Sequence, residues 1–206
     1  MTPRFIYFDM GNVIVTFDRE RAVRNVAAVC GGPPDRVREA LAADSLSGAL
    51  ERGEIDWNAF HAEFSRQTGT RSDPTELAEA YSDMFELSFG MLPVLAGLER
   101  AGCRRGILSN TCGVHWEHLL SRGFGVLPDA FEILAFSHEI GAVKPDLAIF
   151  HRAQALAGVE PSAIFFTDDL PEHVEAARRA GWDAELFTGP LPLARSLEAR
   201  GIDLGL

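Results

Sequence analysis

The stretch "FIYFDMGNVIVTFD", residues 5–18, carries four apolar residues directly into an acid, Asp9. Gly11 and Asn12 follow closely, and both residue types are typical of turns. A short apolar run bounded by a turn predicts a buried β-strand. The carboxylate of Asp9 is therefore expected at the end of that strand, which in a parallel sheet is the edge where ligands bind.

Short apolar runs alternate with helical periods along much of the chain, which is typical of a parallel sheet with helices on its faces. Further strands are predicted by the runs RGIL, EILA, AIFF and AELF at 105–108, 132–135, 163–166 and 184–187. Helices are predicted over 93–100, 145–156, 171–180 and 191–200. The sequence thus predicts an α/β fold with a Rossmann-like, doubly wound parallel sheet.

Between residues 18 and 88 the strand pattern disappears and only helical periods remain. Apolar stripes recur there at helical spacing: Val23, Val26, Ala27 and Cys30, then Trp57, Phe60 and Phe64, then Leu77, Tyr81, Met84 and Phe85. We therefore expect an inserted all-helical cap over residues 18–88 and a core made of residues 1–17 and 89–206. An insertion that begins beside Asp9 can cover a ligand site.

Composition narrows the classes of partner. The net charge is −11 and the 19 Lys and Arg residues are scattered, so we expect no nucleic acid partner. No run approaches the ~20 apolar residues that a membrane span needs, so no membrane partner is expected either. The three cysteines form no Cys-x-x-Cys pair, which favours a reducing compartment. We expect a cytoplasmic protein, either a monomer or a homodimer.

Polar residues follow or flank several predicted strands: Asp9, the pair Ser109-Asn110, Lys144, and the pair Asp168-Asp169. Carboxylates that converge at one sheet edge repel one another unless a cation lies between them, and an oxygen-only ligand set suits Mg²⁺. A nearby lysine, a serine hydroxyl and an asparagine amide would complete a pocket for a group with negative oxygens. One carboxylate could then attack phosphorus and form an aspartyl intermediate.

These motifs, in this order and over nearly the whole chain, resemble the haloacid dehalogenase superfamily, in the form with a helical cap after the first strand. The "FDMGNV" opening most resembles sugar-phosphatase-like members, including the bacterial α-glucose-1-phosphate phosphatase type. The resemblance implies a Mg²⁺-dependent phosphatase that acts on a small phosphorylated metabolite, with sugar 1-phosphates as one candidate class.

The resemblance also implies roles for individual residues. Asp9 would be the nucleophile and a metal ligand, and Asp168 a second metal ligand. Asp169 would lie close behind, in the outer shell of the metal or as support for Lys144. Ser109 and Asn110 would bind phosphate, Lys144 would balance charge, and the backbone carbonyl of Gly11 would also reach the metal.

Gly11 breaks the family pattern, because most phosphatases of the superfamily carry a second aspartate there that protonates the leaving oxygen. A positioned acid is typically worth ~10²–10⁴ in rate. The substrate could have a leaving group that needs little protonation, or another residue could serve, from the cap or as His173 or His138. The chemistry could instead be that of a 2-haloacid dehalogenase, or the protein could bind ligand with little turnover.

The other chemistry-bearing residues are interpreted as structural. His173 opens a predicted helix and is expected to face solvent. His115 and His118 stand three apart on a predicted helix without further ligands at a recognisable spacing, so a helix surface is favoured over a zinc site. Cys112 is interpreted as a packing residue.

Overall fold

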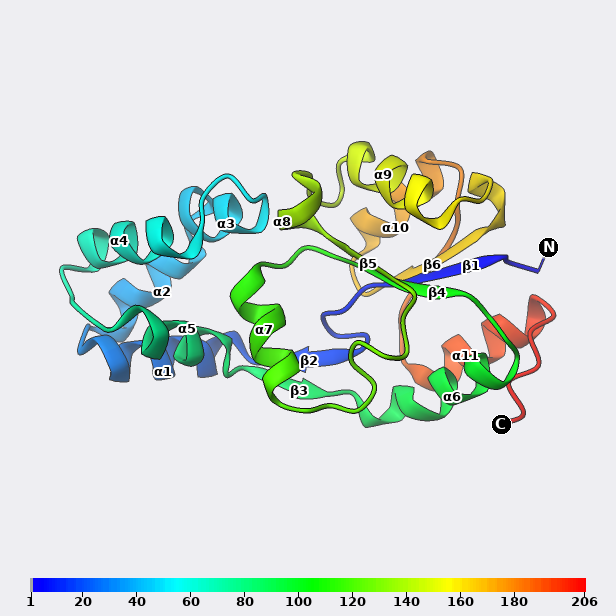
Figure 1. The fold of residues 1–206 in the computed structure, drawn as a ribbon, viewed down its shortest axis with the longest axis horizontal. Helices are drawn as coiled ribbons and strands as arrows, with labels where there is room; N and C mark the ends of the chain where they lie inside the picture. Colours follow the sequence, from blue (N-terminus) through cyan, green and yellow to red (C-terminus); the bar gives the residue numbers. More distant parts are fainter. Residues whose placement is uncertain (1) are drawn as a thin grey trace.

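The computed structural model describes residues 2–206, and its central element is a five-stranded parallel sheet in the order β5-β4-β1-β6-β7 (Figure 1). The strands are β1 (Phe5–Phe8), β4 (Arg105–Ser109), β5 (Ile133–Phe136), β6 (Ile164–Asp168) and β7 (Asp183–Leu186). In the register, Phe8 lies opposite Ile107 of β4 and Thr167 of β6. The predicted α/β fold and its five strands are confirmed, each within two residues of the predicted bounds.

Helices cover both faces of the sheet, and β1 is therefore buried on both sides. Ile6 and Phe8 share a core with the helices below the sheet in Figure 1, whereas Phe5 and Tyr7 pack with α9 and α10 on the opposite face. These helices are α6 (Leu92–Arg100), α7 (Gly113–Ser121), α8 (Ser137–Ile140), α9 (Leu147–Ala157), α10 (Pro171–Arg179) and α11 (Pro190–Ala199). Within residues 2–206 we find no helix that is both long and apolar enough to traverse a lipid bilayer.

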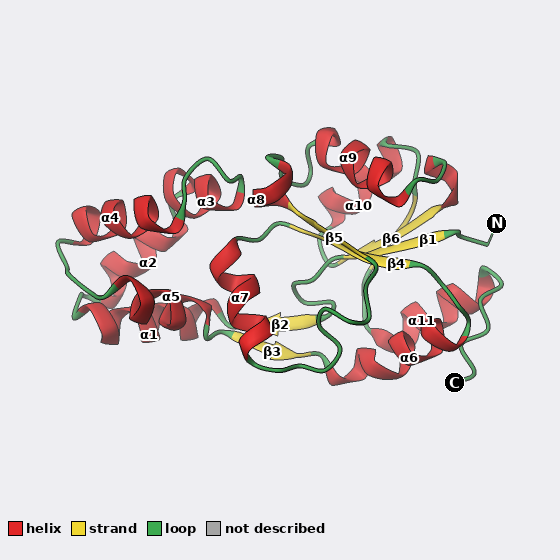
Figure 2. Cartoon of the chain, in the orientation of Figure 1, coloured by secondary structure: helices red, strands yellow, loops and turns green. Residues whose placement is uncertain are grey.

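The segment after β1 forms a separate helical unit at one end of the molecule (Figure 2). Its helices are α1 (Arg19–Cys30), α2 (Pro34–Ala42), α3 (Ala49–Glu51), α4 (Trp57–Thr68) and α5 (Pro74–Ser82), with a short π-helical turn over Asp44–Gly48. The unit has its own core, in which the rings of Trp57, Phe60 and Tyr81 stack. The Asp73 side chain caps α5 by accepting hydrogen bonds from the backbone N–H groups of Thr75 and Glu76.

The expectation that residues 18–88 contain only helical periods is wrong at the end of that range. α5 ends at Ser82, and Phe85 lies in β3 (Phe85–Leu87), antiparallel to β2 (Val15–Phe17). Phe85 is in a strand because it pairs with Phe17, a residue far from it in the sequence. This two-stranded ladder joins the entry and the exit of the helical unit. We propose the division into core and cap at 17/18 and 88/89 on this basis.

Candidate active site

The carboxyl ends of the central strands bring three of the predicted site residues to one edge of the sheet. Asp9 follows β1, while Ser109 and Asp168 close β4 and β6. The backbone N–H of Asp9 donates to the carbonyl oxygen of Thr167 at 2.9 Å, so the pairing of β1 with β6 continues to the acid itself. Asp9 and Asp168 are therefore held on adjacent, hydrogen-bonded strands.

Lys144, the only lysine of the chain, lies between these two acids. Its Nζ donates to Asp9 Oδ1 at 2.7 Å, to Asp168 Oδ2 at 2.6 Å and to the Leu108 carbonyl oxygen at 2.9 Å. The residue is 3% exposed, so it is not a solvated surface lysine. Because an ammonium group has three N–H donors, every one of them is used.

The ionisation of this cluster follows from burial and from the shared lysine. Burial raises the pKa of Asp9, while Lys144 opposes the shift and the nearby Asp168 adds to it. Burial also acts against Asp168, but Lys144 and His173 outweigh it and bring its pKa to about 2. Burial would lower the pKa of Lys144, and the two carboxylates raise it instead. One ammonium group thus faces two carboxyl groups, so its single positive charge cannot balance two carboxylates, and a further cation would balance the remainder.

Asp169 completes a set of acids with the geometry of a metal site. One oxygen each of Asp9, Asp168 and Asp169 lies within 4.8 Å of the others. Asp169 Oδ2 accepts a hydrogen bond of 2.8 Å from Asn12 Nδ2, and Asn12 has a left-handed backbone with φ 54°. Such a donor set, entirely of oxygen, fits Mg²⁺. Within residues 2–206 the carboxylates that accept from Lys144 are those of Asp9 and Asp168, so of the two roles expected for Asp169 the one beside the metal is kept as a proposal.

The side chain of Asn110 holds the main chain of Lys144. Asn110 Nδ2 donates to the Lys144 carbonyl oxygen at 2.9 Å, and Asn110 Oδ1 accepts from the Lys144 N–H at 2.8 Å. The resemblance implies that this amide binds phosphate, whereas in the structure both of its polar atoms bond to the backbone of Lys144. A phosphate contact by Asn110 therefore stays a prediction, as does one by Ser109, which is buried at the end of β4.

Two of the histidines differ from their expected environments. His173 is buried, with Nδ1 at 3.0 Å from both carboxylate oxygens of Asp168, because α10 begins directly beside that acid. His115 is also buried, between the rings of Tyr81 and Phe85, and burial lowers its pKa to about 3. The expectations of an exposed His173 and of a surface position for His115 are therefore wrong.

A cavity of about 430 Å³ lies between the helical unit and the sheet edge. From the core it is lined by Gly11, Ser109 and Asn110 among others. From the helical unit its polar lining residues are Arg19, Glu20, Arg38, Asp44, Ser47, Glu51 and Tyr81. The cap and the phosphate-binding candidates therefore enclose the same space, which is large enough for a small polar molecule.

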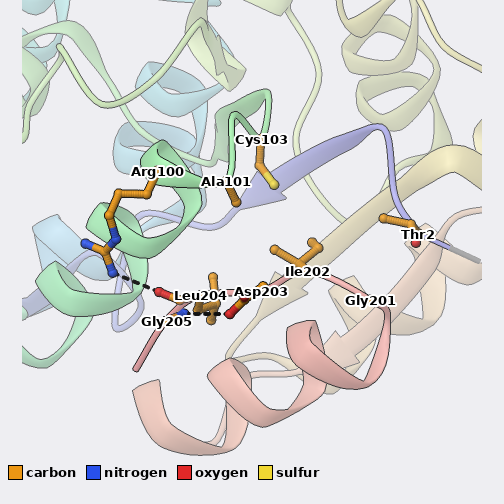
Figure 3. A pocket seen from close by; sticks show the side chains of 9 residues that line it. All are labelled: Thr2, Arg100, Ala101, Cys103, Gly201, Ile202, Asp203, Leu204 and Gly205. Atoms are coloured by element: carbon orange, nitrogen blue, oxygen red, sulfur yellow. Dashed lines mark hydrogen bonds between the residues drawn. The ribbon is translucent and has the colours of Figure 1, made fainter.

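A second cavity, of about 500 Å³, lies elsewhere (Figure 3). Its lining includes Thr2, which precedes β1, and Cys103, which precedes β4, so it lies at the amino-terminal ends of the strands. Arg100 is turned to the carbonyl oxygen of Leu204 at 2.8 Å and holds the C-terminal segment. Because no cluster of acids converges there within residues 2–206, we assign the chemistry to the Asp9 edge.

Gly11 lies close against the side chain of Phe17. A Cβ atom at this position would lie 2.9 Å from Cε1 of the Phe17 ring. We predict that Gly11→Ala lowers the free energy of unfolding by about 1–3 kcal/mol, as measured by urea denaturation. Gly11→Asp would meet the same ring.

The matched control is Gly125→Ala, because a Cβ atom at Gly125 would meet nothing within 4 Å. That variant should change stability by less than about 0.5 kcal/mol. In a Phe17→Ala background the cost of Gly11→Ala should largely vanish, since the clashing ring is gone. Equal costs for Gly11→Ala and Gly125→Ala would contradict the packing argument.

A protein-family model described as haloacid dehalogenase-like hydrolase matches residues 4–181 of the chain. The chain is 26% identical over 207 residues to Phosphatase MT3486 of Mycobacterium tuberculosis, with 90% of this chain and 88% of that protein covered. It is also 26% identical over 183 residues to D-ribitol-5-phosphate phosphatase of Bacteroides thetaiotaomicron, with 86% and 88% covered.

Among solved structures, the fold is similar to that of a haloacid dehalogenase family enzyme from Bacteroides thetaiotaomicron in complex with magnesium and inorganic phosphate. The TM-score is 0.81 at 23% identity, with 91% of this chain and 95% of the other covered. At this identity the similarity establishes the fold.

Proposed function

The chain belongs to the haloacid dehalogenase-like hydrolase family, and from that premise we propose that it is a Mg²⁺-dependent phosphatase of a small phosphorylated metabolite. The observation that carries the proposal is the contact of Lys144 with both Asp9 and Asp168, in a cluster that also includes Asp169. Two curated relatives that cover most of the chain are phosphatases, which supports the same reaction class.

In this proposal Asp9 is the nucleophile. One of its oxygens bonds to phosphorus while the bond from phosphorus to the leaving oxygen breaks, and the leaving oxygen takes up a proton. Water then attacks phosphorus, the bond to Asp9 breaks, and inorganic phosphate is released. Lys144 holds Asp9 in place through Oδ1 and keeps a positive charge beside the reacting group.

The metal and the phosphate have candidate ligands in the same cluster. Asp9, Asp168 and the backbone carbonyl of Gly11 would hold Mg²⁺, with Asp169 beside them. A bound Mg²⁺ would supply positive charge against the phosphate oxygens. Ser109 and Asn110 border the cavity at this edge, and we propose that they contact the phosphate there.

The lining of the cavity favours a substrate that carries hydroxyl groups. Arg19, Ser47 and Glu51 line its cap side, and Arg19 has no carboxylate at ion-pair distance within residues 2–206. A lining with both hydrogen-bond donors and hydrogen-bond acceptors suits the hydroxyl groups of a sugar or a polyol better than it suits an apolar chain. We propose sugar 1-phosphates and polyol phosphates as the first classes to screen.

Removal of the metal tests the reaction class. Treatment with a chelator should lower phosphate release by about 10²-fold or more, and added Mg²⁺ should restore it, because the cluster leaves negative charge uncompensated. The measurement is inorganic phosphate release across sugar phosphates, polyol phosphates and an aryl phosphate. Activity that survives chelation, together with halide release from 2-haloacids, would support the dehalogenase alternative instead.

A further inference from the structure

A phosphatase with this site needs a source for the proton of the leaving oxygen when the substrate is a polyol phosphate, whose alkoxide is a poor leaving group, and the inference here rests on the proposed function. Gly11 has no side chain that could supply that proton. The leaving group would lie on the cap side of the phosphate, in the cavity lined by both parts of the chain. A donor must therefore reach that cavity from another element.

The histidines do not meet this need. His173 is directed at Asp168, and Nδ1 of His138 is 3.0 Å from the carbonyl oxygen of Thr111. Within residues 2–206 the cavity lining includes neither of them. His115 does line the cavity, but with a pKa of about 3 it is neutral near pH 7 and holds no acidic proton to give.

The acids of the cavity differ in how they are already engaged. Glu20 pairs with Arg38 at 2.8 Å, and Asp44 pairs with Arg52 at 3.0 Å. The carboxylate of Glu51, by contrast, has no hydrogen bond or ion pair within residues 2–206. Burial raises the pKa of Glu51, although Arg19 and Arg52 oppose the shift. Among the acids that line the cavity, Glu51 is thus the one whose carboxyl group makes no hydrogen bond or ion pair within residues 2–206 and whose pKa is raised by burial.

The backbone of Glu51 is tied to the core beside the phosphate-binding segment. Ser137 Oγ donates to the Glu51 carbonyl oxygen at 2.6 Å and accepts from the Thr111 N–H at 3.0 Å. Thr111 stands two residues after Ser109 and lines the same cavity. The cap residue is therefore fixed relative to the segment that we propose binds phosphate.

We propose that Glu51 is the general acid and base that replaces the missing side chain at Gly11. The protonated Glu51 gives its proton to the leaving oxygen as the bond from phosphorus to that oxygen breaks and the bond to Asp9 forms. The resulting Glu51 carboxylate then takes a proton from the water that attacks phosphorus. Cleavage of the Asp9–phosphorus bond releases phosphate and leaves Glu51 protonated for the next cycle.

The test compares a polyol phosphate with 4-nitrophenyl phosphate in wild type, Glu51→Gln and Glu51→Asp. Glu51→Gln should lower kcat for the polyol phosphate by about 10²–10⁴-fold, because the amide has no proton to transfer. With the aryl phosphate, whose leaving group departs without protonation, the variant should still release one equivalent of phenolate in a rapid burst. Turnover after the burst should be slow, because water attack has lost its base.

The matched control is Glu54→Gln, an exposed acid three residues away that does not line the cavity within residues 2–206. It should leave both activities within about threefold of wild type. Glu51→Asp keeps an acid and should recover part of the polyol phosphate activity. If Glu51→Gln folds poorly, the pH dependence of kcat in Glu51→Asp still tests the role of the carboxyl group, because a shifted acid should shift that profile.

The outcomes separate the two proposals. A wild-type protein that hydrolyses neither phosphate, with or without Mg²⁺, overturns the phosphatase proposal and the role of Glu51 together. A wild-type protein that hydrolyses both, with Glu51→Gln within threefold on the polyol phosphate, overturns only the role of Glu51. An equal loss on both substrates without a phenolate burst would make Glu51 a binding residue and would also overturn its role as an acid.

Discussion

Asp9→Asn is expected to lower kcat by about 10⁴-fold or more on every phosphate substrate. The amide keeps the shape of the side chain but is too weak a nucleophile to attack phosphorus. The fold should persist, because Lys144 retains Asp168 and the Leu108 carbonyl oxygen as partners. Steady-state phosphate release and far-UV circular dichroism measure the two expectations separately.

Asp129→Asn serves as the control for this variant, because it is the same chemical change at an exposed turn residue. It should retain full activity. If folded Asp9→Asn keeps activity within tenfold of wild type, Asp9 is not the nucleophile, and a different group at the sheet edge must attack the substrate.

Lys144→Met is expected to cost both activity and stability. Removal of the ammonium group leaves Asp9 and Asp168 facing each other with side-chain exposures of 11% and 0%. Loss of one partner from a buried ionic cluster typically costs about 3–5 kcal/mol of unfolding free energy. Mg²⁺ should recover more stability in this variant than in wild type, because the two carboxylates then need a cation more strongly. Urea denaturation with and without Mg²⁺ measures the loss of stability and its recovery, and phosphate release measures the loss of activity.

Two further variants sharpen this prediction. Lys144→Arg keeps the charge, but a planar guanidinium group is larger than the ammonium group and has a different donor geometry, so it should recover little activity. Arg195→Met removes an exposed cation and should change stability by less than about 0.5 kcal/mol. A Lys144→Met protein as stable as Arg195→Met would show that the buried contacts of the lysine contribute nothing to folding.

The sequence predicted the sheet well because buried parallel strands form short apolar runs that end on polar residues. The edge with Asp9, Ser109 and Asp168 followed from that pattern alone, since parallel strands present their carboxyl ends together. β3 was missed because its first residue, Phe85, continues the apolar stripe of Leu77, Tyr81 and Met84, and only the pairing with β2 shows that it begins a strand.

The environments of single side chains could not be predicted in the same way. The engagement of Asn110 with Lys144 joins residues that are 34 positions apart. The contact of Ser137 with Glu51 spans 86 positions. Such contacts depend on how segments far apart in the sequence pack together. The hydrophobic periodicity of a single sequence does not report that packing. The broken pattern at Gly11 indicated that the leaving oxygen lacks its usual proton donor, and it left open whether another residue replaces that donor or the substrate needs none.

Isolation of the covalent intermediate tests the central claim most directly. The protein is mixed with a phosphate substrate and Mg²⁺, quenched in acid during turnover and digested, and the peptides are analysed by mass spectrometry. We predict a phosphoryl group on the peptide that contains Asp9, stable in acid and removed by hydroxylamine, and absent from Asp9→Asn. A phosphoryl group on another peptide, or none while phosphate is being released, would contradict the account.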